Sequence, residues 1–431
     1  MAKEDKSMER SAIDQLKKWK ENPRRKPLIV EGARQVGKTW LIKEFAKQCY
    51  QQLAYINFEE KKHLRNLFAE DFDLNRILLA IQTETKVNGR DADTLLFFDE
   101  IQEAENGLTV LKYFQENAPE LHLIVAGSLL GIELHKKESF PVGKVDFLKM
   151  YPLSFREFLL ATGETGLHHL LLTDDWQTKN TFATKYTGRL RQYYYVGGMP
   201  EAVSAFSQGA SLEEVRTIQK NILDSYDNDF SKHAPTKMVP RIKQLWNSIP
   251  AQLSRENRKF VYGLVKEGAR AREYELALMW LNDCGLIHIV NRVTIPKLPL
   301  KAYEDRNAFK LFMVDVGLMG AMNEVDAQLL LRENALLTEF KGAMTEQYVL
   351  QQIVPRFTPY YWSKNNAQAE IDFLIQRKNG LVPIEVKAEE NLRAKSLRLF
   401  VQDYAPALAI RTSMSPYRKE SWMTNLPLWA I

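Results

Sequence analysis

Cysteine, long apolar runs and excess charge of one sign are all scarce in this 431-residue chain. Its two cysteines, Cys49 and Cys284, lie far apart in the sequence, which excludes a disulfide framework and a cysteine metal knuckle and favours a reducing compartment. The most apolar stretch, residues 123–134, is interrupted by glycine, serine and glutamate and is shorter than the roughly 20 residues of a membrane helix. The charged N-terminal segment MAKEDKSMER has no apolar core of a secretory signal. We therefore expect a cytoplasmic protein with no membrane partner.

The charge of the chain is nearly balanced, with 59 Lys and Arg against 54 Asp and Glu and a formal net charge of +5. The composition, 45% hydrophobic and 26% charged, is that of an ordinary globular protein and excludes wholesale disorder and collagen-like or coiled-coil structure. Residues 341–431 contain 12 basic and 8 acidic residues, so nearly all of the surplus positive charge lies there. The sequence therefore places any DNA or RNA partner at this C-terminal region.

Residues 1–160 alternate short apolar runs with amphipathic stretches, which predicts βαβ units, a parallel sheet and an α/β fold class. We expect the strands of this sheet at residues 28–30, 53–58, 95–98, 121–126 and 145–148. Residues 161–237 lack the strand pattern and predict a helical subdomain, interrupted by the sequence GGMP at 197–200.

Two further units are expected in the rest of the chain. Residues 238–325 predict two or three helices followed by strands at 286–290 and 308–314, and helices followed by a hairpin suggest a winged helix. Residues 326–431 predict a helix at 336–353 and three strands around an Asn-Gly turn, which together make a small α/β domain.

The segment GARQVGKT at residues 32–39 follows a predicted strand and precedes a predicted helix, as in a phosphate-binding P-loop. Its glycines let backbone N–H groups wrap the phosphates, and the helix N-terminus adds positive dipole. Lys38 would reach the β- and γ-phosphate oxygens of ATP, and Thr39 would offer a hydroxyl to Mg²⁺. The residues predicted to contact the nucleotide here are Gly32, Arg34, Gln35, Val36, Gly37, Lys38, Thr39 and Trp40.

Two carboxylates, Asp99 and Glu100, end an apolar strand about 60 residues after the P-loop. In that position Asp99 would hold Mg²⁺ through water, and Glu100 would polarise the attacking water. The next strand is followed by Ser128, which is either a sensor of the γ-phosphate or a plain turn residue.

These segments together resemble the prokaryotic AAA-type ATPases that carry a C-terminal domain of unknown function. The resemblance covers essentially the whole chain and is carried by GARQVGKT, DEIQ at 99–102, GS at 127–128, YPLSFREF at 151–158 and GGMP at 197–200. It implies an AAA+ or STAND-like ATPase core (1–160), a helical lid (161–237), a winged helix (238–325) and a restriction-endonuclease-like domain (326–431). By analogy with such proteins we also expect a homo-oligomer.

The resemblance also gives two loop residues a role. Pro200 matches the G-x-P of STAND ATPases, whose proline packs on the adenine; the alternative is a helix-breaking turn. Arg34 would contact phosphate or cap a neighbouring element.

An acid on one strand followed about a dozen residues later by E-x-K on the next is the pattern of PD-(D/E)XK nucleases. Asp372, Glu385 and Lys387 fill that pattern, and Glu346 lies on the helix that opens the domain. Strand alternation places Glu385 and Lys387 on one face, so the acids would bind Mg²⁺ and Lys387 would activate water. The alternative is a surface ion pair without catalysis.

The predicted winged helix carries basic residues before and within its second helix, but Glu267, Glu273 and Glu275 lie among them. Such a surface would either contact DNA phosphates, as in a transcriptional regulator, or pack against another part of the assembly, and its mixed charge favours packing.

The sequence thus predicts a Mg²⁺-dependent enzyme that binds ATP or ADP, hydrolyses ATP and uses its nucleotide state to control a nuclease-like domain that acts on nucleic acid. The alternative is an ATP-driven switch or scaffold whose nuclease-like domain does not cleave.

Overall fold

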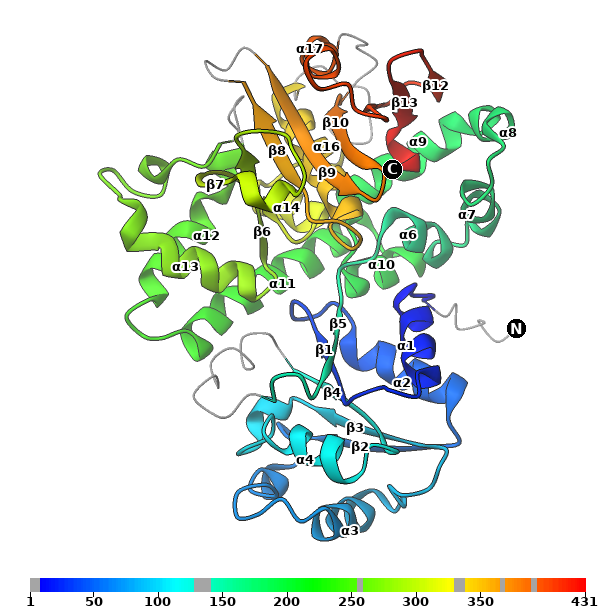
Figure 1. Ribbon diagram of the computed structural model, residues 1–431, viewed down its shortest axis with the longest axis vertical. Helices are drawn as coiled ribbons and strands as arrows, with labels where there is room; N and C mark the ends of the chain where they lie inside the picture. Colours follow the sequence, from blue (N-terminus) through cyan, green and yellow to red (C-terminus); the bar gives the residue numbers. More distant parts are fainter. Residues whose placement is uncertain (1–7, 128–140, 254–258, 329–337, 365–368, 389–393) are drawn as a thin grey trace.

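Two sheets, each flanked by helices, form the two lobes of the computed structural model (Figure 1). The structure describes residues 8–127, 141–253, 259–328, 338–364, 369–388 and 394–431. The predicted sensor residue, Ser128, lies outside these described residues.

The N-terminal lobe is built around a five-stranded sheet, counted over the described residues, in the order β2-β3-β4-β1-β5. All of its neighbouring strands are parallel, which confirms the predicted α/β class. The strands are β1 Leu28–Glu31, β2 Gln52–Asn57, β3 Thr94–Asp99, β4 His122–Ala126 and β5 Asp146–Lys149. Every residue of β3 is buried, which explains why this strand is a continuous apolar run without alternation.

Helices cover both faces of this sheet. Alternate residues of the strands pack with α1 (Ala12–Glu21) and α2 (Lys38–Cys49) on one face, and with α3 (Leu74–Thr85) and α4 (Val110–Asn117) on the other. Short 3₁₀ turns η1 (Lys62–Leu64) and η2 (Ile101–Glu103) complete the lobe.

The region predicted to be helical is helical, and its helices lie between the two lobes and along one side of the upper lobe (Figure 1). The break at GGMP separates the long helix α9 from α10, with the proline at the first position of α10, where it removes no helical hydrogen bond. The helices are α6 Phe155–Ala161, α7 Thr165–Leu171, α8 Trp176–Thr181, α9 Ala183–Val196, α10 Pro200–Ser207 and α11 Leu212–His233.

The second lobe contains an eight-stranded sheet, counted over the described residues, in the order β12-β13-β11-β10-β9-β8-β6-β7. The strands are β6 Ile287–Val293, β7 Glu304–Met313, β8 Tyr360–Ser363, β9 Glu370–Arg377, β10 Gly380–Val386, β11 Ile410–Ser413, β12 Arg418–Lys419 and β13 Thr424–Pro427. The helices are α12 Val239–Leu253, α13 Ala271–Asp283, α14 Val316–Met322, α16 Thr338–Ile353 and α17 Lys395–Tyr404. The 3₁₀ turns are η3 Tyr262–Leu264, η4 Leu300–Tyr303 and η6 Leu428–Ala430.

The hairpin β6–β7 differs from a free wing. It follows α12 and α13, as the predicted winged helix requires, but β6 also pairs with β8 through Arg292 and Val293. Strands from before and after the predicted boundary at residue 325 therefore belong to one continuous sheet. The physical reason is that β6 offers one edge to β7 and its other edge to β8.

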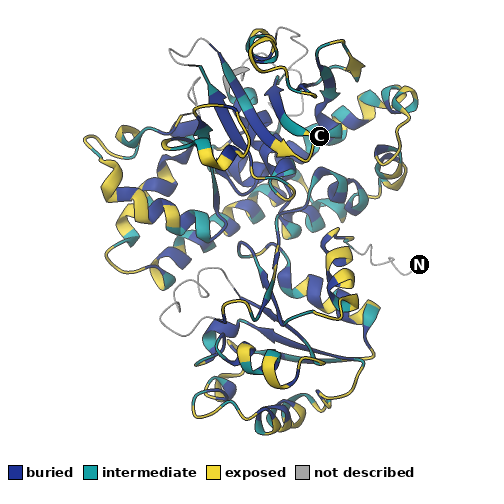
Figure 2. Ribbon diagram, in the orientation of Figure 1, coloured by how far each residue is buried: buried dark blue, intermediate teal, exposed yellow. Residues whose placement is uncertain are grey.

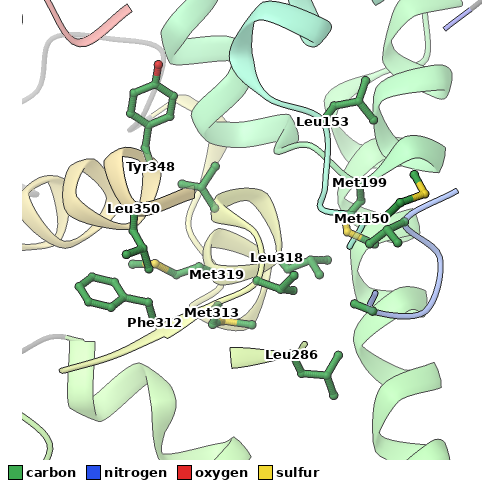
Figure 3. Packing of buried hydrophobic residues seen from close by; sticks show 14 of the residues in the cluster. Met150, Leu153, Met199, Leu286, Phe312, Met313, Leu318, Met319, Tyr348 and Leu350 are labelled. Carbon is green, nitrogen blue, oxygen red and sulfur yellow. The ribbon is translucent and has the colours of Figure 1, made fainter. Parts of the chain in front are cut away.

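Buried hydrophobic residues join the two lobes in one cluster (Figures 2 and 3). Met150 and Leu153, from the segment between β5 and α6, lie beside Met199 of the GGMP break. The same cluster includes residues of β7, α14 and α16, among them Met313, Leu318 and Leu350. The GGMP break, the hairpin β6–β7 and α16 therefore share a core. None of the described helices is long and apolar enough to cross a membrane.

Candidate functional site

The P-loop lies between β1 and α2, where the chain makes a tight turn. Gly32 has φ +151° and Gly37, the residue before α2, has φ +88°, so both occupy backbone conformations that favour glycine. A Cβ atom on Gly32 would lie 2.5 Å from the carbonyl oxygen of Met150. The two predicted glycines are therefore required by the fold of the turn.

Lys38 begins α2 and is buried inside the loop. Its Nζ donates to the carbonyl oxygens of Gly32 and Ala33, each at 3.0 Å. Burial lowers the pKa of Lys38 to about 8, although the nearby carboxylates of Glu100 and Asp99 act in the opposite direction. A phosphate placed in the loop would give this ammonium an anionic partner in place of the two carbonyls.

Thr39 and Asp99 meet because β1 and β3 both pair with β4, which brings their carboxyl ends to the same edge of the sheet. The hydroxyl of Thr39 donates to Oδ2 of Asp99 at 2.8 Å, and the hydroxyl of Tyr55 donates to the same oxygen at 3.1 Å. Burial raises the pKa of Asp99, opposed by the hydrogen bond from Thr39. A hydroxyl and a carboxylate in contact form an oxygen donor pair that suits Mg²⁺.

Glu100 follows Asp99 in a left-handed backbone conformation, φ +50°, which is uncommon outside glycine. Its carboxylate accepts a hydrogen bond from the side-chain amide of Gln102. Strained backbone at a buried strand end is often found at functional sites.

A pocket of about 220 Å³ opens beside the first turn of α2 and brings Pro200 to the P-loop. A Cβ on Gly37 would lie 3.4 Å from Cγ of Pro200, so the proline packs directly over the loop. Trp40, 39% exposed, forms another wall. The lining residues are Met8, Arg10, Gly37, Trp40, Pro200, Glu201 and Ser204.

Arg10 is a pocket residue that the sequence patterns did not identify. Its guanidinium donates to the carbonyl oxygens of Val36 in the loop and Tyr151 after β5, at 3.3 and 2.6 Å, and lies 3.5 Å from the carboxylate of Glu157. It therefore joins the loop to Tyr151 and to Glu157 of α6.

The remaining loop residues contact α11. Arg34 forms an ion pair with Asp229, and the amide of Gln35 donates to the hydroxyl of Ser225 at 3.2 Å. The hydroxyl of Tyr226 donates to the carbonyl oxygen of Arg34 at 2.9 Å. Arg34 therefore binds α11.

The four residues predicted for a nuclease-like site lie near one another in the second lobe, but with an additional lysine among them. Glu385 on β10 pairs with Lys387 at 2.8 Å. Glu346 on α16 and Asp372 on β9 lie 3.7 and 3.9 Å from Nζ of Lys310 on β7.

The same cluster contains a fourth acid, Glu370, whose Oε1 is 2.5 Å from the Lys310 ammonium. Burial raises the pKa of Asp372, and the neighbouring Glu346 raises it further. Burial alone would lower the pKa of Lys310, but Glu346, Glu370 and Asp372 outweigh it and the pKa is raised. Among the described residues, no group of three or more His, Cys, Asp or Glu side chains has a geometry that could hold a metal ion.

Models of three protein families match three separate segments of the chain. Residues 24–159 match the model described as "AAA domain". The first lobe is a P-loop domain of the AAA type. Residues 187–329 and 341–431 match two models described as domains of unknown function (DUF8612 and DUF4143).

Solved structures similar to the chain include the Walker-type ATPase of Pyrococcus abyssi, at 14% identity and a TM-score of 0.46, covering 73% of this chain and 95% of that one. Two others are the Aeropyrum pernix ORC1 protein in complex with DNA (13% identity, TM-score 0.26, 70% and 87% covered) and Drosophila ORC bound to DNA (13%, 0.24, 73% and 86%). TM-scores and identities this low do not support the inference of any property of this protein from those structures. A search of curated proteins finds no match.

The GGMP turn is linked to the second lobe through Asp315, the residue that caps α14. Its carboxylate accepts hydrogen bonds from the backbone of Gly198, next to the pocket, and from the side-chain amide of Gln351 on α16. The same carboxylate also caps α14 through the N–H groups of Gly317 and Leu318. A single buried side chain therefore contacts the GGMP turn, the start of α14 and α16.

Proposed function

We propose that this protein binds ATP with Mg²⁺ at the P-loop, hydrolyses it, and transmits its nucleotide state to the second lobe. The observation that carries the proposal is the contact between Thr39 and Asp99 beside the buried Lys38, in a loop that turns at the positive-φ glycines Gly32 and Gly37. The AAA family match of this segment supports it.

Each residue has a separate task in this proposal. Backbone N–H groups of the loop and the ammonium of Lys38 bind the phosphates, and the adenine occupies the pocket beside Pro200 and Trp40. Thr39 and Asp99 hold Mg²⁺, which supplies charge neutralisation at the β- and γ-phosphates. Glu100 orients and polarises the attacking water once its carboxylate leaves the amide of Gln102.

The direct test of nucleotide binding is Lys38→Ala. Titration with a fluorescent ATP analogue should show loss of binding in this variant, because the β- and γ-phosphates lose their cationic partner. Lys47→Ala, an exposed lysine on the same helix, is the matched control and should bind as the wild type does. Retained ATP affinity in Lys38→Ala would contradict the phosphate placement.

Of the two outputs expected from the sequence, the geometry of the second lobe favours a switch over a nuclease. Two of the three carboxylates that would bind metal in a PD-(D/E)XK enzyme, Glu346 and Asp372, lie within 4 Å of the Lys310 ammonium, and the third, Glu385, pairs with Lys387. Asp315, in contrast, connects the nucleotide pocket to the helix that carries Glu346. The nuclease proposal is tested by incubating labelled DNA or RNA with the protein, Mg²⁺ or Mn²⁺ and ATP; cleavage that disappears in Asp372→Ala would support it over the switch.

A second proposal concerns α13, the recognition helix of the predicted winged helix. Its outer face exposes Leu276 (65%) and Met279 (52%) beside Arg272 and Glu275, which suits contact with protein, including another copy of this chain, better than contact with DNA phosphates. DNA binding whose affinity falls steeply with salt and is reduced in Arg272→Ala would contradict this proposal.

A further inference from the structure

Lys310 is a buried lysine in the interior of the second lobe. Its side chain is 2% exposed, and it is the only charged residue in the apolar end of β7, Ala308 to Met313. Its Nζ lies 2.5 Å from Glu370, 3.7 Å from Glu346 and 3.9 Å from Asp372. The ammonium thus has a carboxylate partner from β9 on one side and from α16 on the other.

The fold holds this lysine in place through its backbone. Three residues further along β7, Met313 exchanges two hydrogen bonds with the side-chain amide of Gln347, at 2.8 and 2.7 Å. Gln347 is the neighbour of Glu346 on α16, so the strand and the helix that carry the ion pair are fixed to each other. On the other side, Phe260 donates its N–H to the carbonyl oxygen of Phe309 at 2.8 Å. Lys310 is therefore part of a clamped strand with little freedom to withdraw.

A metal ion and this ammonium would compete for the same oxygens. An ion bound to Glu346 and Asp372 would lie within about 4 Å of Nζ, where two positive charges in a buried site repel strongly. To make room for the metal ion, the Lys310 ammonium would have to move away from the three carboxylates. It would then be buried without a partner, or β7 would have to shift with it, and both changes cost free energy. The second lysine, Lys387, pairs with Glu385 at 2.8 Å, and its positive charge also lies near Asp372 and Glu346, so it adds to the repulsion of a metal ion.

We propose that Lys310 is the resident cation of the cluster formed by Glu346, Glu370 and Asp372, and that it keeps divalent metal out of this site. The nuclease-like lobe then folds without metal and does not cleave nucleic acid by metal-dependent chemistry. The ion pairs of this cluster connect the hairpin β6–β7 to β9 and to α16. This proposal concerns the second lobe and is independent of ATP binding at the P-loop.

The test is a Mn²⁺ titration of the full chain without nucleotide, in which electron paramagnetic resonance measures the concentration of free Mn²⁺. The wild type should show no Mn²⁺ site that depends on Asp372. Lys310→Met, which keeps the length of the side chain and removes its charge, should bind Mn²⁺ about 10-fold more tightly or better, and Lys310→Met/Asp372→Asn should lose that gain. Lys301→Met, an exposed lysine close to the hairpin, is the matched control and should behave as the wild type.

Two results would overturn the proposal. One is Mn²⁺ binding, or cleavage of labelled DNA or RNA, by the wild type that disappears in Asp372→Asn. The other is a Lys310→Met variant that folds, as shown by ATP binding at its intact P-loop, yet gains no Mn²⁺ site. If Lys310→Met does not fold, the comparison of Mn²⁺ binding by the wild type and Asp372→Asn still tests whether metal occupies the cluster. Failure of ATP binding in the wild type would count only against the proposed ATPase function.

Discussion

The carboxylate of Asp315 accepts a hydrogen bond of 2.6 Å from the backbone N–H of Gly198, two residues before the Pro200 that lines the pocket. Asp315 is fully buried, and a Cβ on Gly197 would lie 2.1 Å from its Oδ1. Burial raises the pKa of Asp315, opposed by hydrogen bonds from Gly198, Leu318 and other donors. The turn that reaches the pocket beside the P-loop is thus fixed by a side chain from the second lobe.

Replacing Asp315 with asparagine should loosen this turn. The NH₂ group of asparagine is a donor and would face a backbone N–H from which the carboxylate accepts a hydrogen bond. That hydrogen bond is lost, so we expect the free energy of unfolding to fall by about 2–4 kcal/mol. ATP affinity should also fall, because Pro200 loses its support. Thermal unfolding and an ATP titration measure the two effects. Asp174→Asn, an exposed aspartate, is the control; equal stability and affinity of the two variants would contradict the role of Asp315.

Filling the pocket should separate base binding from phosphate binding. Ser204 lines the pocket, so Ser204→Phe should weaken ATP binding about 10-fold or more by excluding the adenine, while competition by inorganic tripolyphosphate stays unchanged. Gln208→Phe, exposed just beyond the end of α10, is the control for a new aromatic residue. An unchanged ATP affinity in Ser204→Phe would show that the adenine does not bind in this pocket.

The P-loop and its acidic partner could be predicted from sequence because their determinants are local or follow from sheet geometry. The turn needs glycine at residues 32 and 37, and parallel strands place Asp99 at the same edge as Thr39. The strands of the first sheet also lie within a residue or two of their predicted positions. The family resemblance predicted only that Pro200 packs on the adenine, which stays a prediction; no local pattern specifies its contact with Gly37.

The partners of Asp315 and Lys310 could not be predicted, since they depend on how distant segments pack. Glu370 of β9 comes into the same sheet as Lys310 because β6 pairs with both β7 and β8. Glu346 comes near because Gln347 of α16 bonds to Met313 of β7. A sequence signal was present: a single lysine within an apolar strand predicts a buried charge with acidic partners. The contacts of Arg34 with α11 left no comparable signal, because they join residues nearly 200 positions apart.

The stability of the AAA domain should depend on pH through His122, at the start of β4. Its ring packs against the rings of Trp19 and Tyr50, and burial together with Arg25 and Lys20 lowers its pKa from 6.5 to about 4. Below pH 6.5 the unfolded chain takes up a proton that the folded chain does not, so the free energy of unfolding falls as the pH drops toward 4.

The expected loss between pH 7 and pH 4 is about 1–2 kcal/mol, because the ring is only partly buried. His122→Phe should reduce this pH dependence, and denaturant unfolding at several pH values measures it. Equal slopes for the wild type and His122→Phe would show that another group titrates in this range.

The central claim, ATP hydrolysis at the P-loop, is tested most directly by single-turnover phosphate release from Mg²⁺-ATP by the wild type and Glu100→Gln. The glutamine keeps the size of the side chain and removes its ability to polarise water. We expect the wild type to release phosphate, and Glu100→Gln to bind ATP with similar affinity but release phosphate at least about 100-fold more slowly. A release rate that is the same in both proteins would contradict the account.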